Sequence, residues 1–400
     1  MLPAEQRRCP ETIIGLADWT ANIQRSALQE MLSALATPGL LSFALGLPAP
    51  ELFPIEGYSR AVAKALSQGP GAFQYSHSLE PLKKQIVKLM EQRGLACREG
   101  QILLTSGAQQ GLSLLTQLLL NPGGQALTED LLYPGMRQVL ELHQPRILTV
   151  PCDVRQGIDL NALEYLLADG ARPAFLYANT DGHNPLGISL SLQARTRLVA
   201  LAREYRMPIL EDDAYGLLYY GDQMLPPLRA FDDHWVLYIG SFSKILMPAL
   251  RIGWVIIPEE FIPQLSIAKE ASDIDTATFA QRTASAYLES GEMSDHLKKL
   301  RACYRQRRDI MRGALKRYFP RESRLSDSNS GFFIWVELPD ELKTTPLLRR
   351  SMEQEKVAFI PGEAFAVGNR HRADNCMRLN FSNCEPEQIE EGIRRLARAL

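Results

Sequence analysis

Between residues 101 and 257 the sequence contains seven short, mostly apolar runs, and segments of helical character separate many of them. The runs span 101–105, 124–128, 146–150, 174–178, 207–211, 236–240 and 253–257. Short continuous apolar runs are typical of strands buried on both faces, as in a parallel sheet covered by helices. The alternation of strands with helices therefore predicts a three-layer α/β domain around a mostly parallel sheet.

The pattern changes after about residue 290, where a long charged helix leads to a strand in the run GFFIWVEL. The remaining expected elements are a helix at 345–355, strands at 357–360 and 376–381, and a helix at 386–399. A length of 400 residues suits two or three domains. We predict an N-terminal segment that joins the small domain, a large domain, and a smaller α+β domain, with bounds 1–55, 56–290 and 291–400.

Composition excludes several classes of protein. Hydrophobic residues make up 46% and charged residues 22% of the chain, as in an ordinary globular protein, and the net charge of −2 lacks the basic footprint of a nucleic-acid binder. The N-terminus shows no signal-peptide pattern and no run is long enough to span a membrane, so we expect a cytoplasmic protein without membrane partners. The six cysteines form no CxxC pair, which predicts reduced thiols and no metal site.

The most informative stretch is IGSFSKILMPALRIGW, residues 239–254. Lys244 follows a predicted strand, at the sheet edge where α/β proteins place ligands. Ser241, Ser243 and Arg251 can bind a dianionic phosphate, and a cationic neighbour lowers the pKa of a lysine amine. The pattern predicts a Schiff-base nucleophile, although a surface lysine in a serine-rich turn fits it too.

The run LEDDAYGLLYY, residues 210–220, is an apolar strand that ends in acids. Alone it fits a metal site or a solvated strand end, and the lack of nearby histidines argues against the metal. Beside a Schiff-base lysine, an acid has another use, because it keeps a pyridine nitrogen protonated and lets pyridoxal phosphate act as an electron sink.

The motif DDAY at 212–215, followed by SFSK at 241–244 with Arg251 seven residues on, resembles the class I/II pyridoxal-phosphate aminotransferases of fold type I. The similarity runs from about residue 20 to the end and looks most like the 2-aminoadipate and aromatic aminotransferase branch. The resemblance implies pyridoxal 5'-phosphate as cofactor and transfer of an amino group between an L-amino acid and a 2-oxo acid through a Schiff base at Lys244.

In the family's pattern Lys244 matches the lysine that forms the Schiff base and moves the Cα proton. Asp212 matches the acid at the pyridine nitrogen, and Tyr215 the phenol at the ring hydroxyl. Asn184 matches an asparagine at the same ring oxygen, although its motif NPLG alone also signals a turn. Tyr133 matches the aromatic residue stacked on the ring, in a loop where a core tyrosine fits as well.

The run TSGAQQG, residues 105–111, looks like the family's phosphate loop, which presents backbone N–H groups at a helix N-terminus. A hydroxyl residue often stands at the place of Ala108, so we expect one side-chain bond to the phosphate to be missing. The implied phosphate cup consists of Gly107, Ala108, Gln109, Ser241, Ser243 and Arg251.

The substrate ligands also follow from the resemblance. Arg378 matches the arginine that binds the substrate α-carboxylate, and Gly46 the backbone segment that closes over the substrate. Tyr75 matches a tyrosine that reaches the phosphate of the other subunit's cofactor, which implies a homodimer with shared active sites. Gln29 stands where aminoadipate-specific members carry an arginine for the distal carboxylate, so a strict preference for dicarboxylic substrates is not expected.

Several segments depart from the branch pattern. The loop after Tyr75 is short and lacks its customary glycine, and Leu45 and Ser330 stand where glycine is usual, which narrows the substrate space or stiffens loops. The run ANTDGHNPLG replaces a proline- and glutamine-containing run and is expected to place Asp181 and His183 near the cofactor ring.

These departures leave alternatives open. His183 and His77 fit either a general base or a polar loop histidine. A pyridoxal-phosphate decarboxylase, lyase or oxidase on the same scaffold is the alternative activity. A transcription regulator is disfavoured, because about 20 residues before the matched region are too few for a winged helix.

The run 296–324 holds eleven Lys and Arg residues, which can mark a nucleic-acid patch or a partner-binding helix. Its apolar residues recur at helical spacing, which favours a surface helix with one buried face and a solvated opposite face. Those apolar residues are Leu297, Leu300, Tyr304 and Met311.

Overall fold

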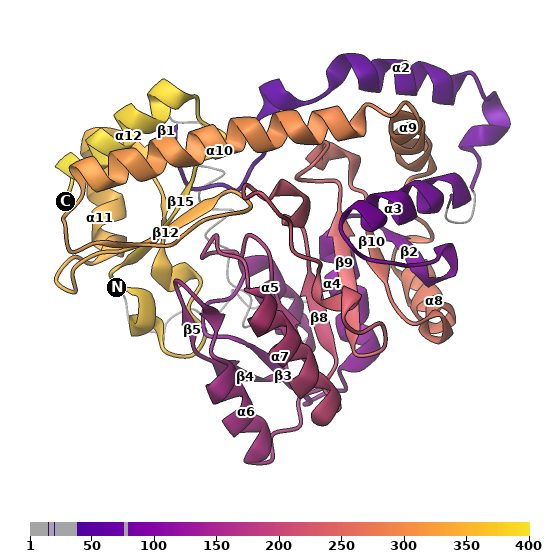
Figure 1. Cartoon of the computed structure of the whole chain (residues 1–400), viewed down its shortest axis with the longest axis horizontal. Helices are drawn as coiled ribbons and strands as arrows, with labels where there is room; N and C mark the ends of the chain where they lie inside the picture. Colours follow the sequence, from indigo (N-terminus) through magenta and orange to yellow (C-terminus); the bar gives the residue numbers. More distant parts are fainter. Residues whose placement is uncertain (1–14, 16–19, 21–37, 76–78) are drawn as a thin grey trace.

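The computed structural model describes residues 15, 20, 38–75 and 79–400 of the chain. Two of the predicted residues, Gln29 and His77, lie outside these residues. The described part forms a large lobe and a smaller one, and the long helix α10 (Met293–Tyr318) runs along both (Figure 1).

The large lobe is organised around a seven-stranded sheet with the order β2-β10-β9-β8-β7-β3-β4. Strand β10 is antiparallel to both of its neighbours, and the other strand pairs are parallel. Each predicted apolar run forms one of these strands, which confirms the α/β fold class. The bounds are β2 Ile102–Thr105, β3 Gln125–Glu129, β4 Arg146–Val150, β7 Phe175–Ala178, β8 Ile209–Asp212, β9 Val236–Ser241 and β10 Gly253–Ile256.

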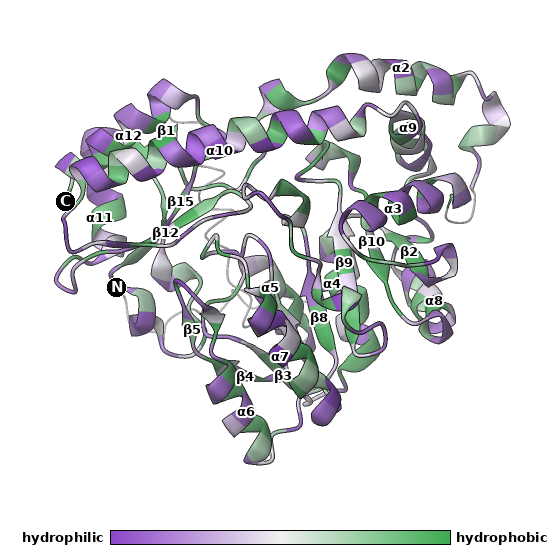
Figure 2. Cartoon of the chain, in the orientation of Figure 1, coloured by the Kyte–Doolittle hydropathy of each residue, from purple (hydrophilic) through white to green (hydrophobic). Residues whose placement is uncertain are grey.

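Helices cover both faces of this sheet. Successive residues of a strand point to opposite sides, so neighbouring residues pack against different helices. On β8, Leu210 packs in a cluster with α4, α5 and α8, whereas Ile209 packs in a cluster with α6 and α7. Figure 2 shows the strands as a hydrophobic layer between helices with hydrophilic outer sides. The helix bounds are α4 Ala108–Leu119, α5 Pro134–His143, α6 Leu160–Ala168, α7 Leu192–Glu204 and α8 Ile262–Asp273.

The smaller lobe contains an antiparallel sheet with the order β11-β12-β15-β14. The short strand β1 (Leu41–Ser42) pairs in parallel with β13 (Val357–Ala358), so an N-terminal segment lies against the C-terminal part of the chain. The exact domain boundaries stay predictions. The elements are β11 Arg324–Leu325, β12 Phe333–Glu337, β14 Ile360–Pro361, β15 Cys376–Asn380, α11 Thr344–Arg350 and α12 Pro386–Arg398, and the remaining helices of the large lobe are α2 Ile55–Leu66, α3 Glu80–Gln92 and α9 Thr278–Glu289.

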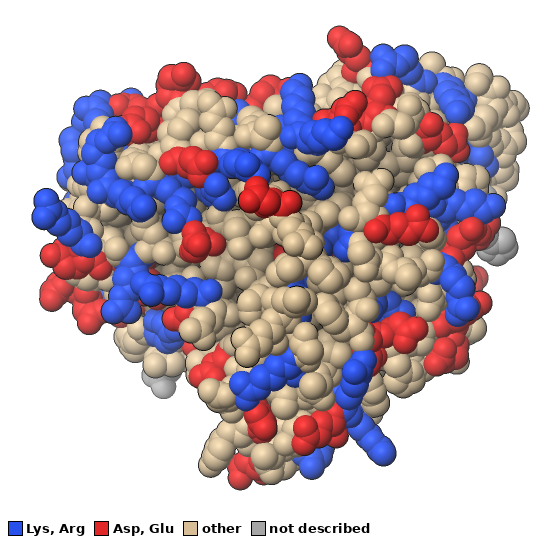
Figure 3. Space-filling view, viewed as in Figure 1, with Lys and Arg blue, Asp and Glu red and all other residues tan. Residues whose placement is uncertain are grey.

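Most of the basic run forms α10, and its four predicted apolar residues are all buried. Lys and Arg side chains follow this helix on the outer surface, interspersed with acidic ones (Figure 3), as expected of a solvated face. Arg307 is an exception, because its side chain is only 3% exposed and pairs with Glu51 and Glu385 at 2.6 and 3.0 Å. Within the described part of the chain, none of the helices combines the length and hydropathy of a membrane span.

Candidate active site

A cavity of about 250 Å³ opens at the carboxyl ends of the central strands β7, β8 and β9. Side chains from the large lobe, the N-terminal loop and the small-lobe sheet all contribute to its walls. The structure thus brings together predicted residues that lie far apart in the sequence. Those lining the cavity are Gly46, Ala108, Gln109, Tyr133, Asn184, Asp212, Tyr215, Ser241, Ser243, Lys244, Arg251 and Arg378.

Lys244 follows β9 by three residues and points into the cavity. Its Nζ donates a hydrogen bond to the carbonyl oxygen of Gly46 at 2.9 Å. Burial and the positive charges of Arg378 and Arg251 lower the pKa of Lys244 to about 8. A large fraction of this amine is therefore neutral just above neutral pH, which is the state required of a nucleophile.

Asp212 is the last residue of β8 and is 5% exposed. Its Oδ2 accepts a hydrogen bond from the Tyr177 hydroxyl at 2.9 Å, and its main-chain carbonyl accepts one from Asn179 Nδ2 at 2.6 Å. Burial raises the pKa of Asp212 to about 6, and the charge of Asp213 adds to the rise while the Tyr177 bond opposes it.

The second carboxylate oxygen of Asp212, Oδ1, is buried and has no hydrogen-bond partner among the described residues. Buried polar atoms in native proteins nearly always have a partner, so this oxygen suits a ligand that presents an N–H donor or a cation. The protonated ring nitrogen of pyridoxal phosphate is such a group.

An anion cradle lies at the N-terminus of α4. Gly107 caps this helix with a φ of 88°, a backbone conformation that favours glycine, and an added Cβ would meet the guanidinium of Arg251. Arg251 also donates to the carbonyl oxygen of Ser106 at 3.2 Å. Ser241 and Ser243 line the same cavity, with their hydroxyls 3.0 Å apart. Free N–H groups, hydroxyls and a guanidinium together suit a phosphate dianion.

Arg378 on β15 is 5% exposed. It donates to Asn184 Oδ1 at 2.7 Å and to the carbonyl oxygen of Ala44 at 2.6 Å. The rings of Phe333 and Phe365 lie 4.2 and 4.8 Å from its guanidinium carbon. Burial lowers the pKa of Arg378 to about 10, so the group stays cationic at neutral pH and suits a carboxylate.

Two tyrosines complete the polar wall. Tyr133 precedes α5, and burial raises its pKa to about 12. Tyr215 is 6% exposed, and burial likewise raises its pKa, so both phenols are neutral donors at physiological pH. Ser330, predicted to stiffen a loop, donates to the carbonyl oxygen of Tyr215 at 3.0 Å. Leu45 is buried among apolar side chains outside the cavity wall.

Four predicted residues lie elsewhere. Tyr75 is 80% exposed and does not reach this cavity within the chain. The expectation that Asp181 and His183 lie near the cofactor ring is wrong, because neither lines the cavity. His183 instead has its Nε2 2.9 Å from a Glu129 carboxylate oxygen, as expected of a loop histidine. Gln29 lies outside the described residues.

The sequence reasoning missed the residues that orient Asp212. Tyr177 lies within a predicted buried strand, and Asn179 follows its end. A tyrosine in an otherwise apolar buried strand needs an acceptor for its hydroxyl, and that signal was available in the sequence.

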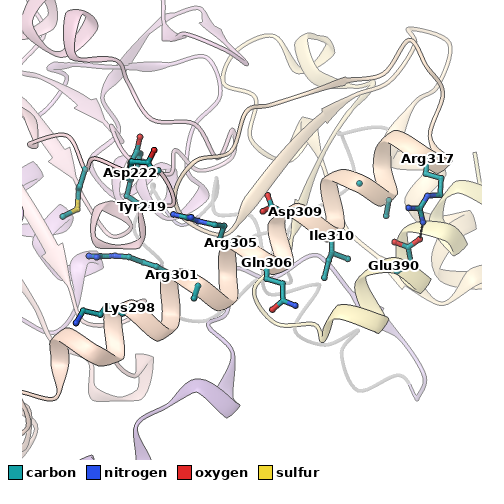
Figure 4. Close-up of a pocket in the computed structure, with 15 residues that line it drawn as sticks. Tyr219, Asp222, Lys298, Arg301, Arg305, Gln306, Asp309, Ile310, Arg317 and Glu390 are labelled. Atoms are coloured by element: carbon teal, nitrogen blue, oxygen red, sulfur yellow. Dashed lines mark hydrogen bonds and ion pairs between the residues drawn. The ribbon is translucent and has the colours of Figure 1, made fainter.

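A larger groove, about 950 Å³, runs along the outer side of α10 (Figure 4). Charged side chains of α10 line it together with Tyr219, Asp222 and Glu390. Arg317 pairs with Glu390 across one end at 2.6 Å, and Arg301 donates to the carbonyl oxygen of Leu217 at 2.8 Å. Its described lining contains none of the predicted site residues, so the smaller cavity is the candidate active site.

The fold and the cavity together define a class of protein. A buried lysine with a lowered pKa, an unpartnered acid oxygen and an anion cradle at a helix N-terminus surround one cavity at the carboxyl edge of the sheet. This combination fits a pyridoxal-phosphate enzyme of fold type I.

Comparison with known proteins gives the family. The family model of class I and II aminotransferases matches residues 52–396. The chain is 39% identical over 385 residues to 2-aminoadipate transaminase of Thermus thermophilus, with 94% of each chain covered. It is 34% identical to aromatic-amino-acid aminotransferase 1 of Thermococcus litoralis, over 94% of this chain and 92% of that one.

A solved structure supports the same assignment. The α-aminoadipate aminotransferase of Thermus thermophilus, in complex with N-(5'-phosphopyridoxyl)-L-leucine, matches with a TM-score of 0.87 and 37% identity, over 96% of this chain and 97% of that one. The chain belongs to the class I and II aminotransferases, and it is an aminotransferase with pyridoxal phosphate as its cofactor. The implied family, fold type and activity are thereby confirmed, in place of the alternative activities.

Proposed function

We propose that Lys244 is the catalytic lysine. Its Nζ would hold the cofactor and, after the amino group of the substrate takes its place, the freed amine would carry the proton to and from the substrate Cα. The observation that carries this proposal is the position of one buried amine, with a pKa of about 8, in the same cavity as Asp212 and Arg378. The bound cofactor supplies an electron sink for the electrons left at Cα. The Gly46 carbonyl, 2.9 Å from Nζ, orients the amine.

The other predicted residues would hold the cofactor. Asp212 would bind the ring nitrogen through Oδ1, and Asn184 and Tyr215 would bind the ring hydroxyl. Tyr133 would stack on the ring. The phosphate would lie in the cradle formed by Gly107, Ala108, Gln109, Ser241, Ser243 and Arg251.

Arg378 would bind the α-carboxylate shared by L-amino acids and 2-oxo acids. The other cations among the described lining residues are Lys244 and Arg251, which have roles toward the cofactor. The rest of that wall includes Leu47 and Ile360. We therefore propose substrates with apolar or aromatic side chains, rather than a strict requirement for a dicarboxylate.

The exposed surface around Tyr75 supports the proposed homodimer. Phe73 and Phe279, 38% and 45% exposed, pack with ring centroids 5.9 Å apart, and Ile274 is 64% exposed. A cluster of exposed apolar side chains is typical of an interface. In the dimer, Tyr75 would contact the phosphate of the partner's cofactor.

A mixed dimer tests this arrangement. A Tyr75→Ala subunit paired with a Lys244→Ala subunit contains one intact site only when Tyr75 acts across the interface. We expect such mixtures to recover activity that neither variant shows alone. No recovery, with dimers present by ultracentrifugation, would place Tyr75 outside the site.

The activity test supplies an amino acid and 2-oxoglutarate to the holoenzyme. The expected result is one glutamate for each amino donor consumed, lost in Lys244→Ala. Carbon dioxide, ammonia or hydrogen peroxide without glutamate would overturn the proposal. The cytoplasmic location stays a prediction.

A further inference from the structure

A fully buried cluster of charges lies outside the cavity, next to the strand that carries Asp212. Arg93 follows the C-terminus of α3, and its side chain has no exposed area. It pairs with Asp181 and, through Nε at 3.2 Å, with Asp213. Arg195 on α7 donates to both carboxylate oxygens of Asp181, to Oδ1 at 2.7 Å and to Oδ2 at 3.0 Å.

Each acid of this cluster is part of a loop that lines the active site. Asp213 directly follows Asp212, and its Oδ1 accepts from the Gly216 N–H at 2.9 Å, which closes the turn that carries Tyr215. Asp181 lies on the loop between Asn179 and Asn184. Arg93 therefore joins two segments of the active site. One is the turn that carries Asp212 and Tyr215, and the other is the loop between Asn179 and Asn184.

Close packing at Gly216 and the charge of Asp213 both restrict what can stand at the position of Arg93. Gly216 has no room for a Cβ, which would meet Asp213 Oδ1 and the guanidinium of Arg93. The carboxylate of Asp213 is an anion next to Asp212 and raises the pKa of that acid. A buried carboxylate that loses its cationic partner is strongly unfavourable, so Arg93 is needed to hold the Asp213 carboxylate in this position.

We propose that Arg93 is a positioning residue for the reaction, which holds Asp212 and Tyr215 in place for the cofactor by pairing Asp213 with Asp181. The proposal rests on the proposed function, because it takes Asp212 and Tyr215 as cofactor ligands. It also explains the unusual run at 179–187, in which Asp181 supplies a counter-ion rather than a group for the cavity.

The test compares Arg93→Lys with the matched control Arg229→Lys. Both arginines are 2% exposed, but Arg229 donates to the carbonyl oxygen of Val236, at the end of β9 opposite to the active site. Lysine keeps the charge and removes the planar fork that reaches both acids.

For Arg93→Lys we expect the dissociation constant of pyridoxal phosphate to rise about tenfold, kcat to fall more than KM changes, and the absorbance of the bound cofactor to titrate at a shifted pH. Arg229→Lys should lower the melting temperature but leave the cofactor affinity and titration unchanged. If both variants lose stability alike and neither changes the cofactor affinity or titration, Arg93 is only structural and the proposal fails.

Two further variants separate the possible failures. Tyr238→Phe removes a hydrogen bond of 2.9 Å to Asp213 Oδ2 and should cause a smaller change in the same direction, even if Arg93→Lys does not fold. No change in this variant would count against the proposal. If Asp212→Asn leaves the cofactor affinity and the cofactor titration unchanged, the proposed role of Asp212 itself is overturned. If Asp212→Asn lowers the cofactor affinity but Arg93→Lys binds the cofactor like the parent protein, only the positioning role of Arg93 is refuted.

Discussion

Replacing Asp212 by asparagine should stabilise the cofactor-free protein while destroying its function. The pKa of Asp212 rises from 3.8 to about 6 on folding, so the ionised acid is disfavoured in the folded chain. The penalty is complete above pH 6 and disappears below pH 4. A shift of about 2 pKa units corresponds to about 3 kcal/mol, so Asp212→Asn should gain up to about 3 kcal/mol at pH 8 and roughly half of that at pH 5.

The measurement is urea denaturation of both cofactor-free proteins at pH 8 and pH 5. Asp213→Asn is the matched control, because the neighbouring acid pairs with Arg93 and its loss leaves a buried cation without that partner. This control should be destabilised at pH 8. An Asp212→Asn protein that is equally or less stable than the parent at pH 8, or a gain that does not change with pH, would refute the reasoning.

Three other substitutions test the cavity. Arg378→Ala should lower kcat/KM for amino acid and 2-oxo acid by about 100-fold, because a lost buried charge pair costs about 2–5 kcal/mol. In steady-state kinetics, a primary amine that lacks a carboxylate should show no such loss of kcat/KM. Lys244→Ala should leave no cofactor attached after borohydride reduction and peptide mapping, and labelling of another lysine would contradict the assignment. Gly107→Ala forces a methyl group against Arg251 at a φ of 88°. It should weaken pyridoxal phosphate binding about tenfold in a fluorescence titration. Unchanged affinity would argue against the cradle.

The sheet and the position of two cavity residues could be predicted because their signals are local, whereas most other cavity residues were predicted only through the family resemblance. A strand buried on both faces is continuously apolar, so the runs that became β8 and β9 are visible without knowledge of their neighbours. The residues at their carboxyl ends must then gather at one edge, and Asp212 and Lys244 do so.

Partner choice over long sequence distances could not be predicted. Asp181 was expected near the cofactor ring, but its partner Arg93 is 88 residues away and nothing local indicates the pair. Arg307 looked like one more cation on a solvated helix, yet it is buried against Glu51 and Glu385. Such pairs depend on which elements pack together, and only the tertiary structure supplies that information.

The continuity of α10 has a mechanical consequence. This helix of 26 residues is about 39 Å long. It packs on α12 of the smaller lobe and on the short turn at 216–218. At that turn, Arg301 donates a hydrogen bond to the Leu217 carbonyl oxygen at 2.8 Å. That turn directly follows Tyr215. Because one continuous helix contacts both lobes, we expect a tilt of the smaller lobe to displace the turn that follows Tyr215, and with it part of the cavity wall.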